Sequence, residues 1–329
     1  MLDSFIFAFN SVAPIIMTVA VGYVLKRMGF IDGDFVKMAN KLVFRVFLPA
    51  MLFLNIYGIE DLGSMSFGYA IYAVIAVIVV FFIMIPISMA TTKDPAARGA
   101  LLQSSFRSNY ALIGIPLATT LFPGEGAAAA TLLSALSIPA FNTLAVISLS
   151  IFKPGKGKGK LKSVLLGIVK NPLILSIFAG LFVLGIRALL VKFDIGFRLS
   201  QIPAIFGTLK YLSNLATPLA LIVLGAQFEF SAISSMKREI TVGTLVRTVL
   251  VPALGLGIAY LAFRNDFDGA QFASLVAVFA TPVAVSSVPM AQEMGADSEL
   301  AGQLVVWTTL VSALSVFLSS FLLSLAGIF

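Results

Sequence analysis

Two apolar segments of the chain contain residues that a membrane-spanning helix usually avoids. They read RSNYALIGIPLA at 107–118 and FATPVAVSSVP at 279–289. A proline has no backbone N–H to donate and its ring clashes with the preceding turn, while a glycine loosens a helix further. In hydrocarbon a freed carbonyl is costly, so such interruptions survive only against protein or a water-filled cavity. We therefore expect a broken helix in each segment, with the interruptions at Gly114, Pro116, Pro282 and Pro289.

Polar side chains beside the two breaks have the chemistry of an anion site. A broken helix exposes unpaired N–H groups and the positive end of its dipole, and neutral amides and hydroxyls complete such a shell without a buried charge. The alternative is that these side chains only hydrogen-bond neighbouring helices, as is common in membrane bundles. The candidates for substrate binding are Asn109, Tyr110, Gly114, Pro116, Thr281, Pro282, Ser286 and Ser287, with Asn142 and Thr308 from two further apolar segments.

Arginines inside the apolar segments are the cations available to a carboxylate. Arg247 is a candidate for substrate binding, because a guanidinium has the fork geometry for a bidentate contact. The other interpretation, that Arg247 snorkels toward lipid headgroups, stays open, and we favour it for Arg45. Arg107 opens the first broken segment and is assigned to a gate at the substrate entrance.

The residue types that are missing exclude several classes of chemistry. The chain has no Cys and no His, so cysteine nucleophiles, thiolate metal sites and histidine proton shuttles are excluded. No Asp or Glu lies at the centre of an apolar segment, whereas a cation–proton exchanger needs buried carboxylates. We expect no cofactor and no proton coupling through a side chain. Sodium as a coupling ion stays open, because carbonyls and hydroxyls at the breaks supply suitable ligand atoms.

The composition places these segments in a membrane. Of the 329 residues, 59% are hydrophobic and only 11% are charged, while a soluble domain has about a quarter charged residues. About twenty apolar residues cross a bilayer, and this rule predicts about ten helical spans with no soluble domain between them. The spans are expected near 5–25, 36–57, 67–90, 100–121, 127–152, 164–190, 204–226, 240–263, 270–292 and 300–328.

Lys and Arg in the short connections predict the orientation of the spans. They concentrate in alternate connections, at 26–37, 93–98, 153–162 and 237–238. These connections are expected to face the cytoplasm, so both termini face outward. The same distribution argues that the formal net charge of +7 does not serve nucleic-acid binding. The Lys/Gly linker at 153–163 is expected to be cytoplasmic, and contact with anionic lipid headgroups is one role for it.

That linker divides the chain into two predicted repeats of five spans, 1–152 and 164–329. An odd number of spans forces the second repeat to insert upside down relative to the first. Prolines and glycines recur between the repeats, although prolines also recur by chance in apolar helices. The matched pairs are Pro14 with Pro172, Gly22 with Gly180, Pro49 with Pro218 and Pro86 with Pro252. Inverted repeats with discontinuous helices are typical of transporters.

The motifs at the breaks resemble the auxin efflux carrier family, particularly its bacterial members. RSNYALIGIP at 107–116 resembles the fourth span of that family, and the other matching motifs are TPVAVSS at 281–287, AQEMGAD at 291–297 and TTLVS at 308–312. The resemblance covers essentially the whole chain. It implies a ten-span inverted repeat in which broken fourth and ninth helices cross, similar to bile-acid symporters and sodium–proton antiporters. It also implies that a transport domain moves against a scaffold like an elevator.

The same resemblance implies an organic anion as substrate, such as the dicarboxylates malate and malonate in bacterial members. The single Asn109 at the crossover and the short linker differ from the plant carriers of auxin. We therefore expect a secondary carrier for a small carboxylate in a bacterial inner membrane, with membrane lipid as its surroundings and a homodimer as one compatible assembly. The alternatives are a sodium-coupled symporter of the bile-acid type, a channel, or a membrane sensor that shares the fold. A membrane enzyme is disfavoured, because His, Cys and paired buried carboxylates are missing.

Overall fold

The computed structural model describes residues 14, 17–58, 67–122, 125–152, 170–228 and 232–329. The predicted linker at 153–163 and much of the predicted first span lie outside the described residues. Within the described residues, the regular structure is helical apart from one isolated β-bridge between Ser108 and Val283. The prediction of an all-α membrane protein is confirmed.

Seven described helical segments are long and apolar enough to cross a membrane. They correspond to the predicted spans two, three, five to eight and ten. They are Gly33–Tyr57, α4 (Gly68–Thr91), α7 (Glu125–Ile151), α9 (Pro172–Lys192), α10 (Pro203–Gln227), Lys237–Phe263 and α16 (Ser298–Leu325). Residues 17–27, which overlap the predicted first span at 5–25, are also helical. Short helical turns, η3 (Leu199–Gln201) and α11 (Ala232–Ser235), lie in the connections.

Three wider π turns stand directly before a helix whose second residue is proline. They are η1 (Val43–Phe47), between α2 (Gly33–Leu42) and α3 (Leu48–Tyr57); η2 (Tyr110–Gly114), before α6 (Ile115–Leu121); and η4 (Val246–Leu250), between α12 (Lys237–Leu245) and α13 (Val251–Phe263). Such turns re-register the hydrogen-bond ladder where proline cannot donate to it. At Pro252, the carbonyl of Thr248 four residues earlier instead accepts a hydrogen bond from Ser315 Oγ at 2.7 Å.

The two predicted broken helices are broken in the structure, but of the four predicted positions only Pro282 lies in a break. Gly114 and Pro116 lie in η2 and α6, after the first break, and Pro289 lies inside a helix, after the second. α5 (Pro95–Phe106) is separated from η2 and α6 by the non-helical residues 107–109. α14 (Gly269–Phe279) is separated from α15 (Ser287–Glu293) by residues 280–286. Asp94 and Asp268 cap the outer ends, since their Oδ1 atoms accept hydrogen bonds from Ala96 N–H at 3.0 Å and Gln271 N–H at 2.8 Å. Each half-helix is therefore anchored at its outer end and stops inside the molecule.

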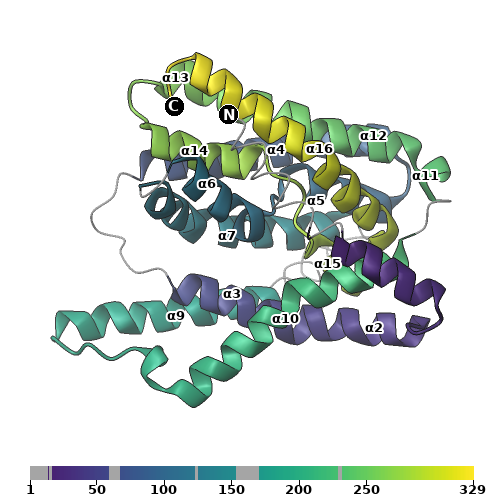
Figure 1. Ribbon diagram of the computed structural model, residues 1–329, viewed down its shortest axis with the longest axis horizontal. Helices are drawn as coiled ribbons and strands as arrows, with labels where there is room; N and C mark the ends of the chain where they lie inside the picture. Colours follow the sequence, from purple (N-terminus) through teal and green to yellow (C-terminus); the bar gives the residue numbers. More distant parts are fainter. Residues whose placement is uncertain (1–13, 15–16, 59–66, 123–124, 153–169, 229–231) are drawn as a thin grey trace, which may run out of the picture.

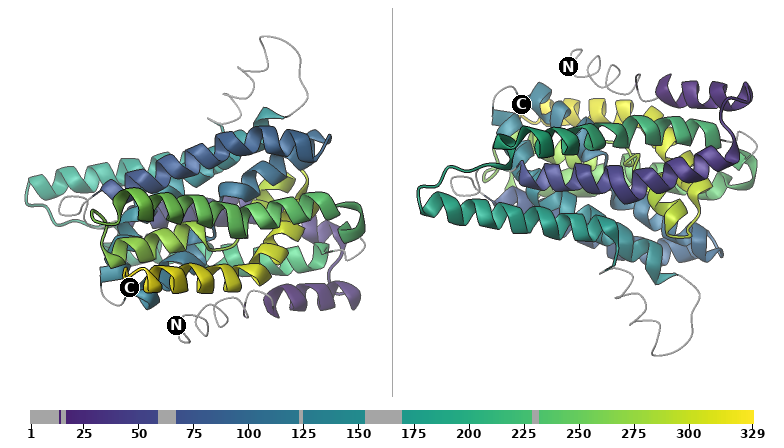
Figure 2. Two further views of the ribbon diagram at one scale, coloured as in Figure 1. Left: turned by 90° about the horizontal axis from the view of Figure 1, so that it is seen from above. Right: turned by 90° about the horizontal axis from the view of Figure 1, so that it is seen from below.

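Figure 1 shows that the helices form two layers. The small layer contains α2, η1, α3, α9 and α10, and the large layer contains α4 to α7 and α12 to α16 with their π turns. The large layer has its own hydrophobic core, which extends from Tyr69 on α4 to Leu323 on α16. A second cluster of buried apolar side chains joins the two layers. The long helices run in roughly the same direction when the molecule is seen from above and below (Figure 2).

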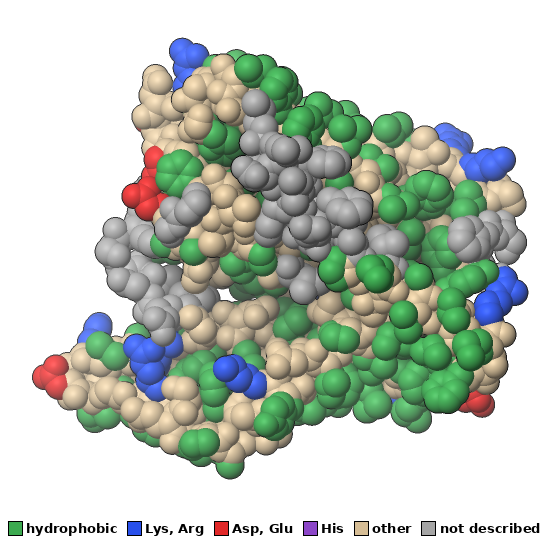
Figure 3. Space-filling view, viewed as in Figure 1, with side chains coloured by type: hydrophobic (Ala, Val, Ile, Leu, Met, Phe, Trp, Pro, Cys, Tyr) green, Lys and Arg blue, Asp and Glu red, His purple; other side chains and the backbone are tan. Residues whose placement is uncertain are grey.

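The outer surface is that of a membrane protein. Hydrophobic side chains cover much of the face shown in Figure 3, and most Lys, Arg, Asp and Glu side chains in this view lie toward the two ends of the long axis. On α4, Ile75 is 55% exposed and Phe82 is 62% exposed. Exposed apolar side chains of this size along a long helix are stable when they face lipid.

Candidate functional site

The two helix breaks meet inside the large layer. Ser108 and Val283 form an isolated antiparallel bridge. Beside it, Asn109 N–H donates to the Pro282 carbonyl at 2.8 Å, and Ala284 N–H donates to the Arg107 carbonyl at 3.2 Å. α5 and α15 lie on one side of this crossing and α6 and α14 on the other (Figure 1). The two breaks therefore satisfy part of each other's backbone hydrogen-bonding needs.

Two neighbouring helices hold the crossing in place. On α16, Thr308 Oγ1 accepts a hydrogen bond from Val283 N–H at 3.1 Å and donates to the Leu304 carbonyl at 2.6 Å. The Tyr110 hydroxyl donates to the Ala130 carbonyl of α7 at 3.0 Å. Because both hydroxyl hydrogens are used by backbone carbonyls, Thr308 and Tyr110 fix the crossing in this structure.

Gly114 is required where η2 approaches α14. A Cβ atom at this position would lie 2.7 Å from Tyr110 Cδ2 and 3.1 Å from the Ala277 carbonyl oxygen. The predicted helix-loosening glycine is thus also a close-approach glycine. Its place lets the Tyr110 ring lie between the first broken helix and α7.

Arg247 is fully buried and faces backbone carbonyls. Its Nε and Nη2 atoms donate to the Thr281 carbonyl at 2.9 and 2.7 Å, and Nη2 also donates to the Val278 carbonyl at 2.7 Å. Its Nη1 atom donates to the Phe106 carbonyl at 3.4 Å. The snorkelling interpretation is wrong, since the side chain is 0% exposed. The predicted bidentate contact with a substrate carboxylate is not favoured either, because backbone carbonyls occupy the donors.

A cavity of about 170 Å³ lies between the crossing and the small layer. The large layer contributes residues 107–111 and 284–286 of the two breaks, together with Ile138, Phe141 and Asn142 of α7. The small layer contributes Leu48, Met51, Leu52 and Asn55 of α3, Leu173 of α9 and Thr217 of α10. The cavity is therefore apolar on most of its small-layer side and polar at the crossing.

Arg107 places a positive charge at the wall of this cavity. Its side chain is 4% exposed, and the guanidinium donates from Nη2 to Asn142 Oδ1 at 2.8 Å and from Nη1 to Met290 Sδ at 2.6 Å. Among the described residues, the structure gives Arg107 no ion pair with a carboxylate. A buried charge without a counter-ion is costly, and the neutral partners of Arg107 leave that cost in place.

Further donors of the crossing are unused at the cavity. Asn109 Nδ2 and Ser108 Oγ are buried and have no hydrogen-bond partner within the part of the chain that the structure describes. The backbone N–H groups of Ala111, Val285 and Ser286 also have no acceptor among these residues. All five residues line the cavity. The wall at the crossing thus offers one cation and several unpaired N–H groups.

The structure divides the predicted site residues into two sets. Those that line the cavity are Arg107, Asn109, Tyr110, Asn142 and Ser286. Those that do not line it, but lie in or against the crossing, are Gly114, Pro116, Thr281, Pro282, Ser287, Arg247 and Thr308. Substrate contact stays a prediction for the first set, whereas the geometry gives the second set a role in building the crossing. Arg107, expected to be a gate, lies in the wall itself.

Sequence reasoning missed the small-layer side of the cavity. Asn55 and Thr217 are its polar residues there. Thr217 directly precedes Pro218, which was considered only for the repeat, and Asn55 lies near the end of an apolar span. Thr217 could have been identified as a polar residue beside a proline within a span. No feature of the sequence singles out Asn55.

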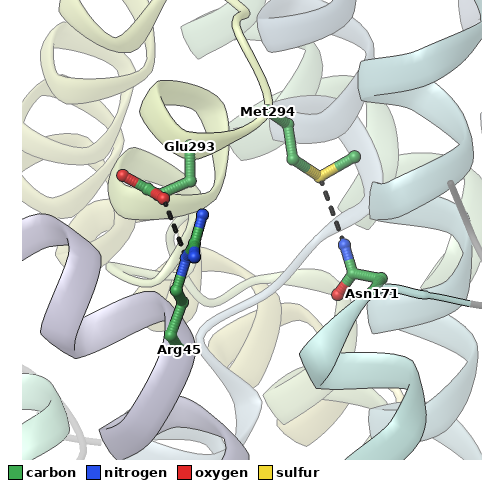
Figure 4. A network of polar contacts seen from close by, with 4 residues as sticks. All are labelled: Arg45, Asn171, Glu293 and Met294. Carbon is green, nitrogen blue, oxygen red and sulfur yellow. Dashed lines mark hydrogen bonds and ion pairs between the residues drawn. The ribbon is translucent and has the colours of Figure 1, made fainter.

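At its far end, α15 is attached to the small layer. Figure 4 shows the Arg45 side chain of η1 pointing to Glu293, with an Nε–Oε2 distance of 3.5 Å, and Asn171 Nδ2 donating to Met294 Sδ at 3.7 Å. Nearby, Gln292 Oε1 accepts hydrogen bonds from Gln227 Nε2 at 2.8 Å and from Asn40 Nδ2. These contacts join the two layers at one end of the molecule.

Comparison with known proteins agrees with this architecture. The chain is 26% identical to an "Uncharacterized transporter" of Methanothermobacter thermautotrophicus over 93% of this chain and 95% of the relative. It is 26% identical to a Rhizobium meliloti protein named "Putative malonate transporter", over 93% of this chain and 92% of the relative. The family model described as "Membrane transport protein" matches residues 7–319. The chain therefore belongs to this membrane transport family, the auxin efflux carrier-like family that the crossover motifs resemble.

Proposed function

We propose that the protein is a secondary carrier of a small organic anion, and that the anion binds in the cavity at the crossing. The observation that carries this proposal is the buried Arg107 guanidinium, which lines the cavity and has only neutral hydrogen-bond partners. An anion that brings a carboxylate to Arg107 supplies the missing counter-charge. Because the chain belongs to a membrane transport family, the proposal includes no catalytic step.

The unpaired donors give a bound carboxylate its orientation. Asn109 Nδ2 and Ser108 Oγ are unpartnered side-chain donors in the wall. The N–H of Ala111 lies in the first turn of η2, which continues into α6. The positive end of that twelve-residue helical stretch, Tyr110–Leu121, adds to the attraction for an anion. A substrate held by Arg107 and Asn109 has its carboxylate at the crossing and its carbon skeleton against Leu52 and Phe141.

The proposed substrate class is a small dicarboxylate. The cavity volume of about 170 Å³ is below the range of about 300–1,000 Å³ that is typical of sites for larger ligands. The Rhizobium meliloti relative is named "Putative malonate transporter". A second carboxylate has donors on the other side of the crossing, at the N–H groups of Val285 and Ser286.

The proposed transport mechanism is movement of the large layer against the small layer. The large layer has its own core and carries both breaks with the charged wall of the cavity, whereas the small layer supplies a mainly apolar wall. Such a division suits alternating access by rigid-body movement around a fixed site. The Lys/Arg pattern supports an orientation with connections 26–37 and 93–98 in the cytoplasm and both termini outside.

A ligand screen on the purified protein tests this proposal. Malonate and malate are expected to raise the midpoint of thermal unfolding by several degrees at saturating concentration, because a ligand that binds only the folded state stabilises it. Arg107→Gln is expected to lose this shift, while Arg264→Gln, at an exposed position, keeps it. If no mono- or dicarboxylate shifts the midpoint of the wild-type protein, the site is not an anion site.

A further inference from the structure

Arg247 is a second buried cation whose role the anion site does not explain. It is 0% exposed and is not part of the cavity wall. Within the described part of the chain, no carboxylate pairs with it. Its donors instead converge on carbonyls from two different helices. A full charge in this position needs a negative partner of comparable size.

The carbonyls around Arg247 belong to the ends of both broken helices. Phe106 is the last residue of α5, Val278 lies in the last turn of α14, and Thr281 follows the end of α14. The last carbonyls of a helix have no partner within it, and each helix end has the effect of about half a negative charge. Two such ends together match the single positive charge of one guanidinium.

We infer that Arg247 is a positioning residue that serves as a built-in counter-cation for the inner ends of α5 and α14. By binding both ends, its guanidinium sets their separation. Arg107 directly follows the bound Phe106 carbonyl, and the Pro282 carbonyl that receives Asn109 N–H directly follows Thr281. Arg247 thereby fixes the two residues that the proposed function assigns to the anion, and the affinity part of this inference rests on that function.

The local structure of the eighth span fits this role. Arg247 lies in η4, and Pro252 stands just after that π turn. The Thr248 carbonyl, which Pro252 leaves without its helical donor, accepts from Ser315 Oγ of α16 at 2.7 Å. A π turn redirects the side chains within it, and the α16 contact fixes the backbone beside Arg247. The guanidinium is thus held from outside the two helices whose ends it joins.

The consequence for selectivity is a separation of charge at the crossing. Arg247 neutralises the carbonyl ends of the broken helices, while Arg107 and the unpaired N–H groups remain without a counter-charge at the cavity. The crossing therefore presents a net positive wall to the substrate. A lysine at this position keeps the charge, but its single ammonium group lacks the planar fork that reaches both helix ends.

Chemical rescue distinguishes this role from simple packing. Arg247→Ala is expected to lower the midpoint of thermal unfolding and to weaken malonate binding by roughly tenfold or more. Millimolar guanidinium chloride is expected to restore both quantities in part, because the free ion enters the vacated carbonyl cage. The same addition should leave the wild type and the Arg264→Ala control unchanged.

The conservative variant keeps the inference testable if Arg247→Ala does not fold. Arg247→Lys is expected to bind malonate roughly tenfold more weakly than the wild type. Wild-type affinity in Arg247→Lys, or a foldable Arg247→Ala that guanidinium does not rescue, would overturn the inference. If the wild type binds no malonate, the proposed function fails instead, and the thermal midpoints with and without guanidinium still decide the role of Arg247.

Discussion

At the scale of single residues, two buried arginines have different kinds of hydrogen-bond partner. Arg107 donates to Asn142 and a methionine sulfur, so its charge is unmatched, whereas Arg247 donates to the carbonyl ends of two helices. The sequence identifies both as unusual because each lies in an apolar segment. It does not distinguish them, because the partners of Arg247 are backbone atoms more than thirty positions away.

Asn109 provides a test at this scale. Asn109→Ala is expected to raise the KM for the transported anion by about tenfold, since a hydrogen bond to a charged group contributes about 1.5–3 kcal/mol. The fold should persist, because the Nδ2 atom has no partner among the described residues to lose. Uptake kinetics in proteoliposomes measure the change, with Asn265→Ala in an exposed loop as the matched control. An unchanged KM would remove Asn109 from the site.

At the scale of elements, prolines and glycines predicted which two helices are broken but not where the first one breaks, because Gly114 and Pro116 follow residues 107–109. Prolines and glycines act locally, so their effect on a helix can be inferred without the fold. The π turns before Pro49, Pro116 and Pro252 were not predicted, because a proline alone does not determine how the preceding ladder adapts. The residues that contact each break were not predicted either, because they come from spans that are distant in the sequence.

The matched glycines lie at helix contacts, and the repeat that they were used to predict stays a prediction. A Cβ atom on Gly22 would contact the Ile222 backbone of α10, and one on Gly180 would lie 3.0 Å from Ile56 Cβ on α3. The first predicted span therefore approaches the seventh as the sixth approaches the second. This is the relation that two equivalent halves would produce, and the limits of the repeats at 152 and 164 stay a prediction as well.

The attachment of α15 to the small layer gives a prediction about the transport cycle. Gln292→Met removes the oxygen that accepts hydrogen bonds from the Asn40 and Gln227 side chains. Each of these hydrogen bonds contributes about 0.5–1.5 kcal/mol to the contact between the layers. We expect the layers to separate more often at this end, with roughly fivefold faster labelling of a Thr217→Cys reporter from the side of the membrane at which α15 ends. Labelling at the wild-type rate would show that these amides do not hold the layers together. Gln201→Met, in η3, is the control.

At the scale of the whole molecule, composition was sufficient for the membrane class. The number of about ten spans stays a prediction, since seven of the described helical segments are long and apolar enough to cross a membrane. Hydrophobic length depends on the bilayer and not on the fold, so it can be measured along the sequence. The grouping of the spans into two layers was not predictable from their residues, because their apolar faces have similar chemistry. The polar contacts between the layers, such as Asn40 with Gln292, were missed for the same reason.

Relative movement of the layers can be tested by linking them. The natural chain has no Cys, so an Asn40→Cys/Gln292→Cys pair is the only one able to form a disulfide. These two side chains are in hydrogen-bond contact between α2 and α15. Oxidation is expected to stop transport and reduction to restore it, while anion binding at the cavity persists. Full uptake by the oxidised, linked protein would exclude movement of α15 away from α2.

A counterflow experiment tests most directly whether the protein is a carrier with its anion site at the crossing. Proteoliposomes loaded with unlabelled malonate are expected to take up labelled malonate faster than empty ones, and this uptake should saturate with concentration. Arg107→Gln should abolish the stimulation, because the guanidinium is the cation in the cavity wall. Wild-type uptake that is neither stimulated nor saturable, or full counterflow in Arg107→Gln, would contradict a carrier whose anion site lies at the crossing.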